Sequence, residues 1–271
     1  MALRRLCAQP PPAPSIGYAA GFHTAQLRRQ RRSADKGDGM KWQALRGVAV
    51  AGVMAMGPGA AGAAQADVGG TLALASDYVW RGSSQTGEDP AVQAGARATH
   101  GTGLYASVWG SNVAFEPDSG ARSEFDAVLG WSGELAPNWS LDANATRYLY
   151  PGTGRALDWT ELSATATFKQ RAWLQLAHSR DALAGGHPGT YAQIGMRLPL
   201  SGATRLEAAY GHYALASAQA RGYQHVQLSV IHAIAPKWEL RATGHATDNA
   251  ARQLFPGNAG SRLEVALQAA F

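Results

Sequence analysis

Apolar and polar side chains alternate with a period of two along most of the chain after residue 66. In the last eleven residues, SRLEVALQAAF, one face carries Leu263, Val265, Leu267, Ala269 and Phe271, and the other face is mainly polar. This period is typical of a strand with one apolar and one polar side. The pattern predicts twelve strands, at residues 68–78, 91–99, 103–111, 124–134, 139–150, 158–168, 172–179, 190–199, 204–213, 224–234, 238–247 and 261–271. Most are close to the ~9–11 residues that a tilted strand needs to cross a bilayer.

The connections between these segments alternate strictly between long and short. The long ones are VWRGSSQTGEDP, NVAFEPDSGARS, PGTGRAL, RDALAGGHPG, ALASAQARGY and DNAARQLFPGNAG, and the short ones are HGT, LAPN, KQR, SGA and APK. A soluble β-sandwich would also alternate along its strands, but long loops on one side and tight turns on the other are typical of an outer-membrane barrel. We therefore predict an all-β fold, an antiparallel transmembrane β-barrel of twelve strands with long extracellular loops, short periplasmic turns and both termini on the periplasmic side.

Aromatic residues and the last residue of the chain agree with this fold. Trp139 and Trp238 each follow a proline-containing short turn, as expected for a girdle at the membrane interface. Phe271, at the end of an amphipathic strand, resembles the C-terminal signal that the barrel assembly machinery reads. We therefore expect a bacterial outer-membrane location, with the assembly machinery, outer-membrane lipid and lipopolysaccharide as partners.

A leader precedes the predicted barrel. From Met40 the sequence has a short basic start, an apolar stretch and small residues that end in Ala64-Gln65-Ala66, which is the layout of a secretory signal peptide cleaved after Ala66. The apolar stretch is too short to span a membrane. Residues 1–39 are rich in proline and arginine and superficially resemble an organellar transit peptide; we interpret them as an over-extended start, with translation beginning at Met40. The predicted division is thus 1–39 extension, 40–66 signal peptide and 67–271 barrel.

The net charge of the whole chain is misleading unless the positions of the charged residues are considered. A formal net charge of +5 and a pI of about 9.5 would ordinarily suggest an anionic partner such as nucleic acid. Nine of the 24 Lys and Arg residues lie at or before Arg46, whereas 15 basic and 17 acidic residues lie from residue 67 onward. The basic charge therefore belongs to the leader, and nucleic acid is not an expected partner. The only cysteine, Cys7, also precedes the barrel, so disulfides and thiolate metal sites are excluded there.

One stretch near the start of the barrel resembles a known family. The residues that carry the likeness are Ser76, Asp77, Tyr78, Arg81, Gly82, Ser84, Gln85, Thr86, Pro90, Gln93, Gly95, Gly103, Tyr105, Trp109, Ser111, Asn112 and Val113. They resemble the TorF family of proteobacterial outer-membrane proteins, described as porins and also called the Gcw_chp family. Ala94 and Arg97 depart from the family motif, and the specific match covers the first three strands. The resemblance implies an outer-membrane barrel with a pore role, and it brings no catalytic residues.

The sequence offers little other chemistry. It contains no HExxH, GxSxG, CxxC or GxxxxGK motif, and no two histidines after residue 66 have a short metal-ligand spacing within one element. A lipid-modifying barrel enzyme would need a serine and a histidine on adjacent strands, and His178, Ser179 and His212 are the candidates for such a pair. We expect these residues to be interfacial or to lie in loops. No catalytic residue, cofactor or metal is therefore predicted, and the protein is not expected to be an enzyme.

The polar strand faces predict a charged lumen. With these faces turned inward, an acidic wall of Glu124, Asp126, Asp142 and Glu161, with no inward Arg or Lys on its own strands, faces an arginine-rich, partly salt-bridged wall. That wall carries Arg197, Arg205, Glu207, Glu239, Arg241, Arg262 and Glu264, and Arg97 lies on the second strand. Such opposite walls would set a transverse field that orients polar solutes. Alternatively, the charges neutralise one another and plug the lumen. Eight strands leave an interior just filled by side chains and sixteen leave a water channel, so twelve allow either outcome.

The stretch Ser76–Thr86 is the densest group of reactive side chains in the chain. We predict that Asp77 and Tyr78 end the first strand, that Tyr78 and Trp80 belong to the outer aromatic girdle, and that Asp77 and Arg81 pair with each other or with lumen charges. Together with Gln85, these residues form a predicted pore mouth. The predicted function is passive diffusion of small hydrophilic solutes through a narrow charged channel. The alternatives are a non-conducting structural or adhesive barrel and, more distantly, a lipid-modifying barrel enzyme.

Overall fold

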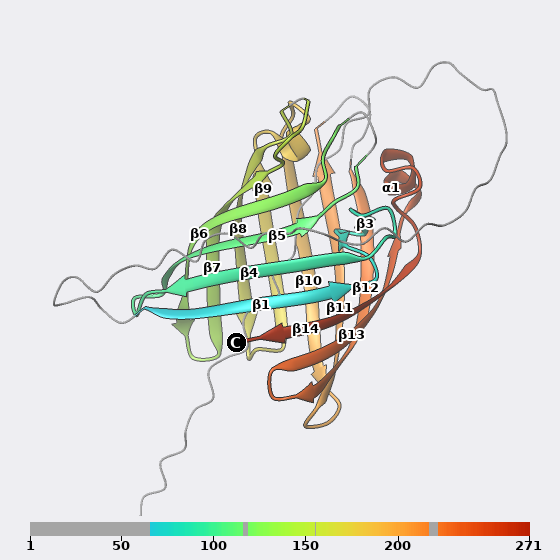
Figure 1. Ribbon diagram of the computed structural model, residues 1–271. Helices are drawn as coiled ribbons and strands as arrows, with labels where there is room; N and C mark the ends of the chain where they lie inside the picture. The colour runs from blue at the N-terminus through green and yellow to red at the C-terminus, as the bar shows by residue number, and fades with distance from the viewer. Residues whose placement is uncertain (1–65, 116–118, 155, 217–221) are drawn as a thin grey trace, which may run out of the picture.

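The computed structural model describes residues 66–115, 119–154, 156–216 and 222–271, and twelve strands in these segments close into one antiparallel barrel (Figure 1). They are β1 (Asp67–Ala75), β4 (Ala91–Thr99), β5 (Leu104–Asn112), β6 (Ser123–Ala136), β7 (Trp139–Leu149), β8 (Trp159–Phe168), β9 (Ala172–Ser179), β10 (Gly189–Pro199), β11 (Thr204–Leu215), β12 (Tyr223–Ala235), β13 (Trp238–Thr247) and β14 (Arg262–Ala270). Each strand pairs with its neighbour in sequence, and β1 pairs with both β4 and β14. Closure leaves no strand edge unpaired, as a lipid environment requires.

The predicted strands are confirmed, with ends that differ by at most three residues. The largest difference concerns the first strand, which ends at Ala75 and therefore excludes Asp77 and Tyr78. The predicted alternation of long and short connections also holds, since the two-residue turn at 236–237 and the long connection at 248–261 flank the same strand, β13. The predicted extension and signal peptide, with the cleavage residues Ala64 and Ala66, fall almost entirely on residues 1–65, outside the described part of the chain.

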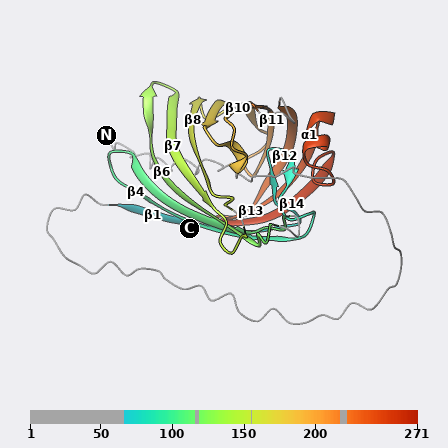
Figure 2. The ribbon, with the colours of Figure 1, turned by 90° about the horizontal axis from the view of Figure 1, so that it is seen from above.

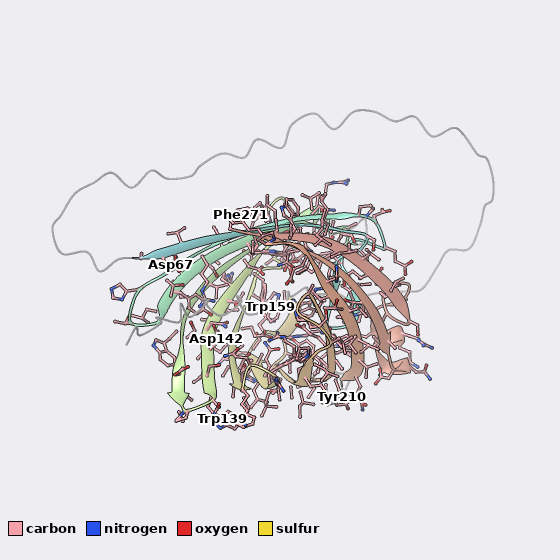
Figure 3. All side chains as sticks on the ribbon, turned by 90° about the horizontal axis from the view of Figure 1, so that it is seen from below. Asp67, Trp139, Asp142, Trp159, Tyr210 and Phe271 are labelled. Carbon is pink, nitrogen blue, oxygen red and sulfur yellow. The ribbon has the colours of Figure 1, made fainter. Side chains whose placement is uncertain are left out.

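The outer face of the barrel is apolar and the inner face is polar. Outward side chains such as Val68, Leu129 and Leu228 are exposed, whereas inward ones such as Glu124 and Ser229 are buried. In Figure 3 Asp142 and Trp159 point into the barrel, and Trp139 and Tyr210 lie on its outer surface. A continuous exposed apolar belt is unfavourable in water and matches the hydrocarbon core of a bilayer. Among the described residues, no helix has the length and hydropathy of a membrane span.

The long connections contain short elements that the alternation did not predict. The first connection forms a small hairpin of β2 (Val79–Trp80) and β3 (Ser83–Ser84), the fourth contains the 3₁₀ turn η1 (Ala182–Ala184), and the sixth contains the helix α1 (Asn249–Leu254). Asp248 caps α1 by accepting a hydrogen bond from the Ala251 amide at 2.9 Å. Figure 2 looks down on the ring of strands, with α1 at its rim. These elements concentrate extra structure at one end of the barrel, which we call the outer end.

Candidate functional site in the barrel lumen

The first long connection, residues 76–90, folds into the lumen. Its hairpin pairs Val79 with Ser84 and Trp80 with Ser83, and the two residues at its tip, Arg81 and Gly82, have φ values of 46° and 84°. A β-carbon at Gly82 would lie 2.6 Å from Thr247 on β13 and 2.8 Å from His225 on β12. The tip therefore rests directly against the inner wall, and glycine provides both the backbone conformation and the space.

Arg81 extends from this tip to strands on the far side of the barrel. Its two terminal nitrogens donate to the two carboxylate oxygens of Glu161 on β8, at 2.9 and 2.7 Å, and both side chains are nearly buried, at 7% and 4% exposed. Since β8 is five strands from β1 in one direction around the barrel and seven in the other, this ion pair spans the lumen. A paired guanidinium and carboxylate in this geometry form a strong, directional contact.

Aromatic rings surround the Arg81 guanidinium. Its central carbon lies 3.8 Å from the ring centroid of Tyr191, 4.3 Å from that of Trp80 and 4.7 Å from that of Tyr213. Burial by itself would lower the pKa of Arg81, but the Glu161 carboxylate reverses this effect, and the pKa stays above its ordinary value. The arginine is therefore a permanent cation held by one carboxylate and by several ring faces.

The base of the inward loop is fixed by Asp77. One of its carboxylate oxygens accepts hydrogen bonds from the hydroxyls of Ser84, at 2.6 Å, and Thr86, at 2.9 Å. The other oxygen lies 3.4 Å from an Arg262 nitrogen on β14. The Gln85 side chain donates to the Ser83 carbonyl at 2.8 Å within the same turn. These contacts make the loop a defined structure, attached both at its base and at its tip.

The two aromatic residues of the loop lie inside the barrel, so their predicted place in the outer girdle is wrong. Tyr78 and Trp80 are each 2% exposed, and they pack against inward rings of the wall. Tyr78 makes an edge contact with Trp109 at 5.4 Å, and Trp80 makes edge contacts with Trp159 and Tyr213 at 6.4 and 6.0 Å. Burial, together with the Glu124 and Asp126 carboxylates, raises the pKa of Tyr78 well above its ordinary value. Both residues therefore fill the lumen rather than mark the interface.

The lumen thus differs between its two halves. At the level of the loop, the aromatic and acidic side chains are almost completely buried, among them Glu124, Tyr148, Trp159, Tyr213 and Tyr223. In the half nearer the short turns, which we call the inner half, the charged side chains of Arg197, Arg205 and Arg241 keep between 21% and 26% of their surface exposed. The outer half is closed in this conformation, and the inner half is a polar vestibule.

The predicted lumen charges all lie on inward positions, and the arginine-rich wall is salt-bridged as predicted, but the pairing of the acidic wall differs from the prediction. The acidic wall is not free of basic partners, because Arg97 from β4 reaches Asp142 at 3.7 Å and Arg81 reaches Glu161. On the other wall the pairs are Arg197–Glu207, Arg205–Glu207, Arg205–Glu239 and Arg241–Glu207, and His245 contacts Glu264. Among the predicted lumen acids that the structure describes, Glu124 and Asp126 have no salt-bridge partner. The transverse field is therefore weaker than two opposite walls would give.

Several residues at the inward loop were not among the predicted site residues. Trp159 contacts Trp80, and Tyr191, Tyr213 and His225 contact Arg81 or Gly82. Each of the four lies at an inward position of its strand. Strand alternation assigns all four to the lumen, so their direction could be read from the sequence. Their contact with residues 80–82 could not be predicted from the sequence, because strand alternation does not indicate which loop folds inward.

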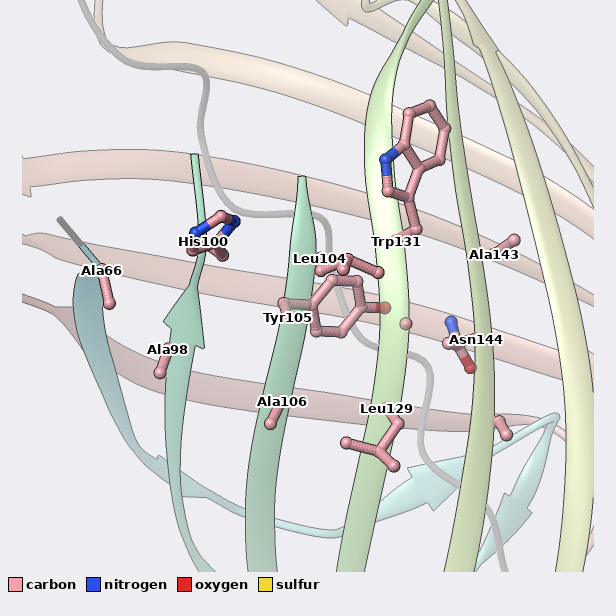
Figure 4. A pocket seen from close by; sticks show the side chains of 12 residues that line it. Ala66, Ala98, His100, Leu104, Tyr105, Ala106, Leu129, Trp131, Ala143 and Asn144 are labelled. Carbon is pink, nitrogen blue, oxygen red and sulfur yellow. The ribbon is translucent and has the colours of Figure 1, made fainter. Parts of the chain in front are cut away.

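The candidates for other chemistry do not come together. His178 and Ser179 face opposite sides of β9: His178 bonds Thr190 at 2.9 Å, and Ser179 donates to the Thr160 carbonyl at 2.6 Å. No group of three or more potential metal ligands occurs among the described residues. A pocket near the inner end is lined largely by outward alanines and leucines of β4 to β7, with Tyr105 and Asn144 beside them (Figure 4). It therefore belongs mainly to the apolar outer wall.

A family model described as "Bacterial protein of unknown function (Gcw_chp)" matches residues 59–265. The chain belongs to this family. The Gcw_chp model thus covers nearly the whole barrel, including the inward loop and its partners on β8 and β10 to β13. No match was found among curated proteins.

Among solved structures, the KdgM porin in complex with disordered oligogalacturonate is 6% identical and has a TM-score of 0.48, with 76% of this chain and 99% of that chain covered. The NanC porin is 7% identical, with a TM-score of 0.48 and the same coverage. The COG4313 outer membrane channel from Pseudomonas putida F1 is 12% identical, with a TM-score of 0.43 and coverage of 78% and 96%. These are distant likenesses to this member of the Gcw_chp family.

Proposed function

We propose that the protein is a porin-like channel of the bacterial outer membrane that passes small hydrophilic solutes, and that residues 76–90 form its gate. The observation that carries this proposal is the Arg81–Glu161 pair, which holds a loop across a charged lumen. A single loop that lies inside the barrel and is not part of its wall can be displaced without unfolding the wall. The likeness of Ser76–Val113 to the TorF porins supports the same role.

The chemistry of the inner half also supports passage of polar solutes. The inward side chains there include arginines, glutamates, glutamines and hydroxyls, and several arginines remain partly exposed. Retaining exposed charge inside a barrel is favourable only where water enters. A wetted vestibule that ends at a gate fits a narrow channel, and polar walls disfavour apolar solutes.

A second candidate is a non-conducting barrel with a structural or adhesive role. The dense packing of the outer half supports it, because the rings of Trp80, Trp159 and Tyr213 leave little exposed surface at that level. If the inward loop is a permanent plug, the charges of the vestibule only neutralise one another. A lipid-modifying enzyme is a more distant candidate; lipid hydrolysis abolished by replacing one serine or histidine would support it.

Conductance separates the first two candidates. We expect the purified full-length protein to give small, infrequent current steps in planar bilayers, because the loop closes the outer half most of the time. A variant in which residues 79–84 are replaced by glycine and serine should give larger and longer steps, since the hairpin and the Arg81 contacts are removed. Absence of ion current from both proteins at every voltage would contradict the channel and favour the permanent plug.

A further inference from the structure

Three arginines of the inner vestibule gather around one buried carboxylate. Arg197 and Arg205 donate to the same Glu207 oxygen at 2.7 and 3.1 Å, and an Arg241 nitrogen lies 3.6 Å from the other oxygen. Glu207 is only 5% exposed, whereas the three arginines are 21% to 26% exposed. The carboxylate therefore lies beneath the arginines, and the guanidinium groups form the surface that faces the lumen. We call Arg197, Arg205 and Arg241 the arginine cluster.

The acidic partners do not neutralise this cluster. Glu239 accepts hydrogen bonds from both terminal nitrogens of Arg205, at 2.6 and 2.8 Å, and the third nitrogen of Arg205 donates to Glu207 at 3.1 Å. Glu207 must then serve both Arg197 and Arg241. Three guanidinium groups against two carboxylates leave one positive charge. Of the other lumen acids, Asp142 has its own partner in Arg97 at 3.7 Å, and Glu264 contacts His245 at 2.9 Å.

Arg241 has the largest unused hydrogen-bonding capacity in the cluster. Its ion pair with Glu207 at 3.6 Å is longer than a hydrogen bond, and among the described residues the Arg241 side chain has no shorter polar contact. A guanidinium carries five N–H donors in a planar fork. Ile231 on β12 pairs with Arg205 on β11 and with Arg241 on β13, and its side chain is fully buried. The aliphatic parts of the two arginine side chains therefore lie on either side of a buried apolar residue. The donors of Arg241 are therefore held in place and available.

We infer that the arginine cluster is a binding site for the oxyanion group, carboxylate or phosphate, of a small solute, with Arg241 as its principal donor. A planar guanidinium matches both groups through two parallel hydrogen bonds, and the excess positive charge attracts them. This inference rests on the proposed channel for its biological meaning, because it makes the vestibule selective for anions. The binding itself does not require conduction.

Calorimetric titration of the purified full-length protein in detergent tests the site directly. We expect sodium succinate and sodium phosphate to bind and glucose not to bind. Arg241→Gln should weaken anion binding about tenfold or more, because charge-assisted hydrogen bonds are lost. Glu239→Gln should strengthen it, because Arg205 is released from its carboxylate. Arg147→Gln is the matched control: Arg147 lies on the outer wall, is 48% exposed and pairs with Asp158 outside the lumen.

The possible results distinguish failure of the binding site from failure of the proposed channel. Binding of either anion that is weakened by Arg241→Gln and not by Arg147→Gln supports the site, even if no current is observed, and the preferred anion then identifies the chemical class. A protein that conducts but binds neither anion, or whose binding is the same in Arg241→Gln, overturns the site and leaves the channel intact. Unchanged heat-modifiable mobility on gels confirms that each variant still forms a closed barrel.

Discussion

Replacing Arg81 with alanine is expected to increase the open fraction of the channel about a hundredfold. In the closed conformation the substitution leaves the Glu161 carboxylate buried without its cation, and removing one partner of a buried ion pair costs about 3–5 kcal/mol. In an open conformation Glu161 is hydrated, so the cost falls on the closed state alone. Each 1.4 kcal/mol corresponds to a factor of ten in the equilibrium. Single-channel recording in planar bilayers measures the open fraction.

A second substitution shows whether the buried charge is the cause. In the Arg81→Ala, Glu161→Gln double variant no carboxylate is left unpaired, so the closed state should partly recover and the open fraction should fall below that of Arg81→Ala. Arg147→Ala, which removes an exposed arginine of the outer wall, should behave as the wild type. Equal open fractions for wild type and Arg81→Ala would show that this pair does not hold the loop.

Among glycine-to-alanine substitutions in the short turns, Gly103→Ala is expected to reduce the stability of the barrel most. Gly103 has a φ of 89°, which costs an L-residue roughly 1–2 kcal/mol. Its new β-carbon would also overlap the backbone carbonyl oxygen of Ser132 and approach the Trp131 indole nitrogen to 2.9 Å. The Ser132 amide donates to the Gly103 carbonyl at 2.9 Å, so a shift of the turn weakens the contact between the β4–β5 turn and β6.

The same turn supplies the control for this substitution. A β-carbon at Gly101 meets nothing within 4 Å, and this residue is not among those with positive φ, so Gly101→Ala should leave stability unchanged or slightly raised. The measurement is the temperature at which the compact band on unboiled gels converts to the unfolded band. A conversion temperature for Gly103→Ala equal to that of Gly101→Ala would contradict the steric argument.

The barrel wall could be predicted from the sequence because it depends on local pattern. Three predicted strands, 91–99, 172–179 and 238–247, have the observed bounds, and period two placed their inward and outward faces correctly. Alternation along 172–179 places Trp173 on the inner face, and it lies there: its indole nitrogen donates to Gln193 at 3.0 Å, and the facing Gly195 leaves room for the ring. Pairing between neighbours in sequence then fixes the topology without any long-range information.

The inward loop could not be predicted in the same way. Tyr78 and Trp80 at a strand end are the residue types expected in an interfacial girdle, and only their contacts with Trp109 and Trp159 show that they fill the lumen. The partner of Arg81 lies 80 residues away on β8. The charged residues of the lumen could be identified from the sequence. Which arginine pairs with which carboxylate could not, because the pairing depends on the radius of the barrel and on the length of the side chains.

The position of the inward loop in the chain has a consequence for assembly. Residues 76–90 follow the first strand, whereas their partners at the tip lie on β8 and β10 to β13, and Asp77 contacts Arg262 on β14. The segment is thus made early but gains its binding surface only after the last strands have been inserted and β14 has paired with β1. Contacts at such sequence separation are costly to form before the intervening chain is ordered. Seating of the loop is therefore expected to be a late step of folding, and a nascent barrel remains unsealed until its circumference is complete.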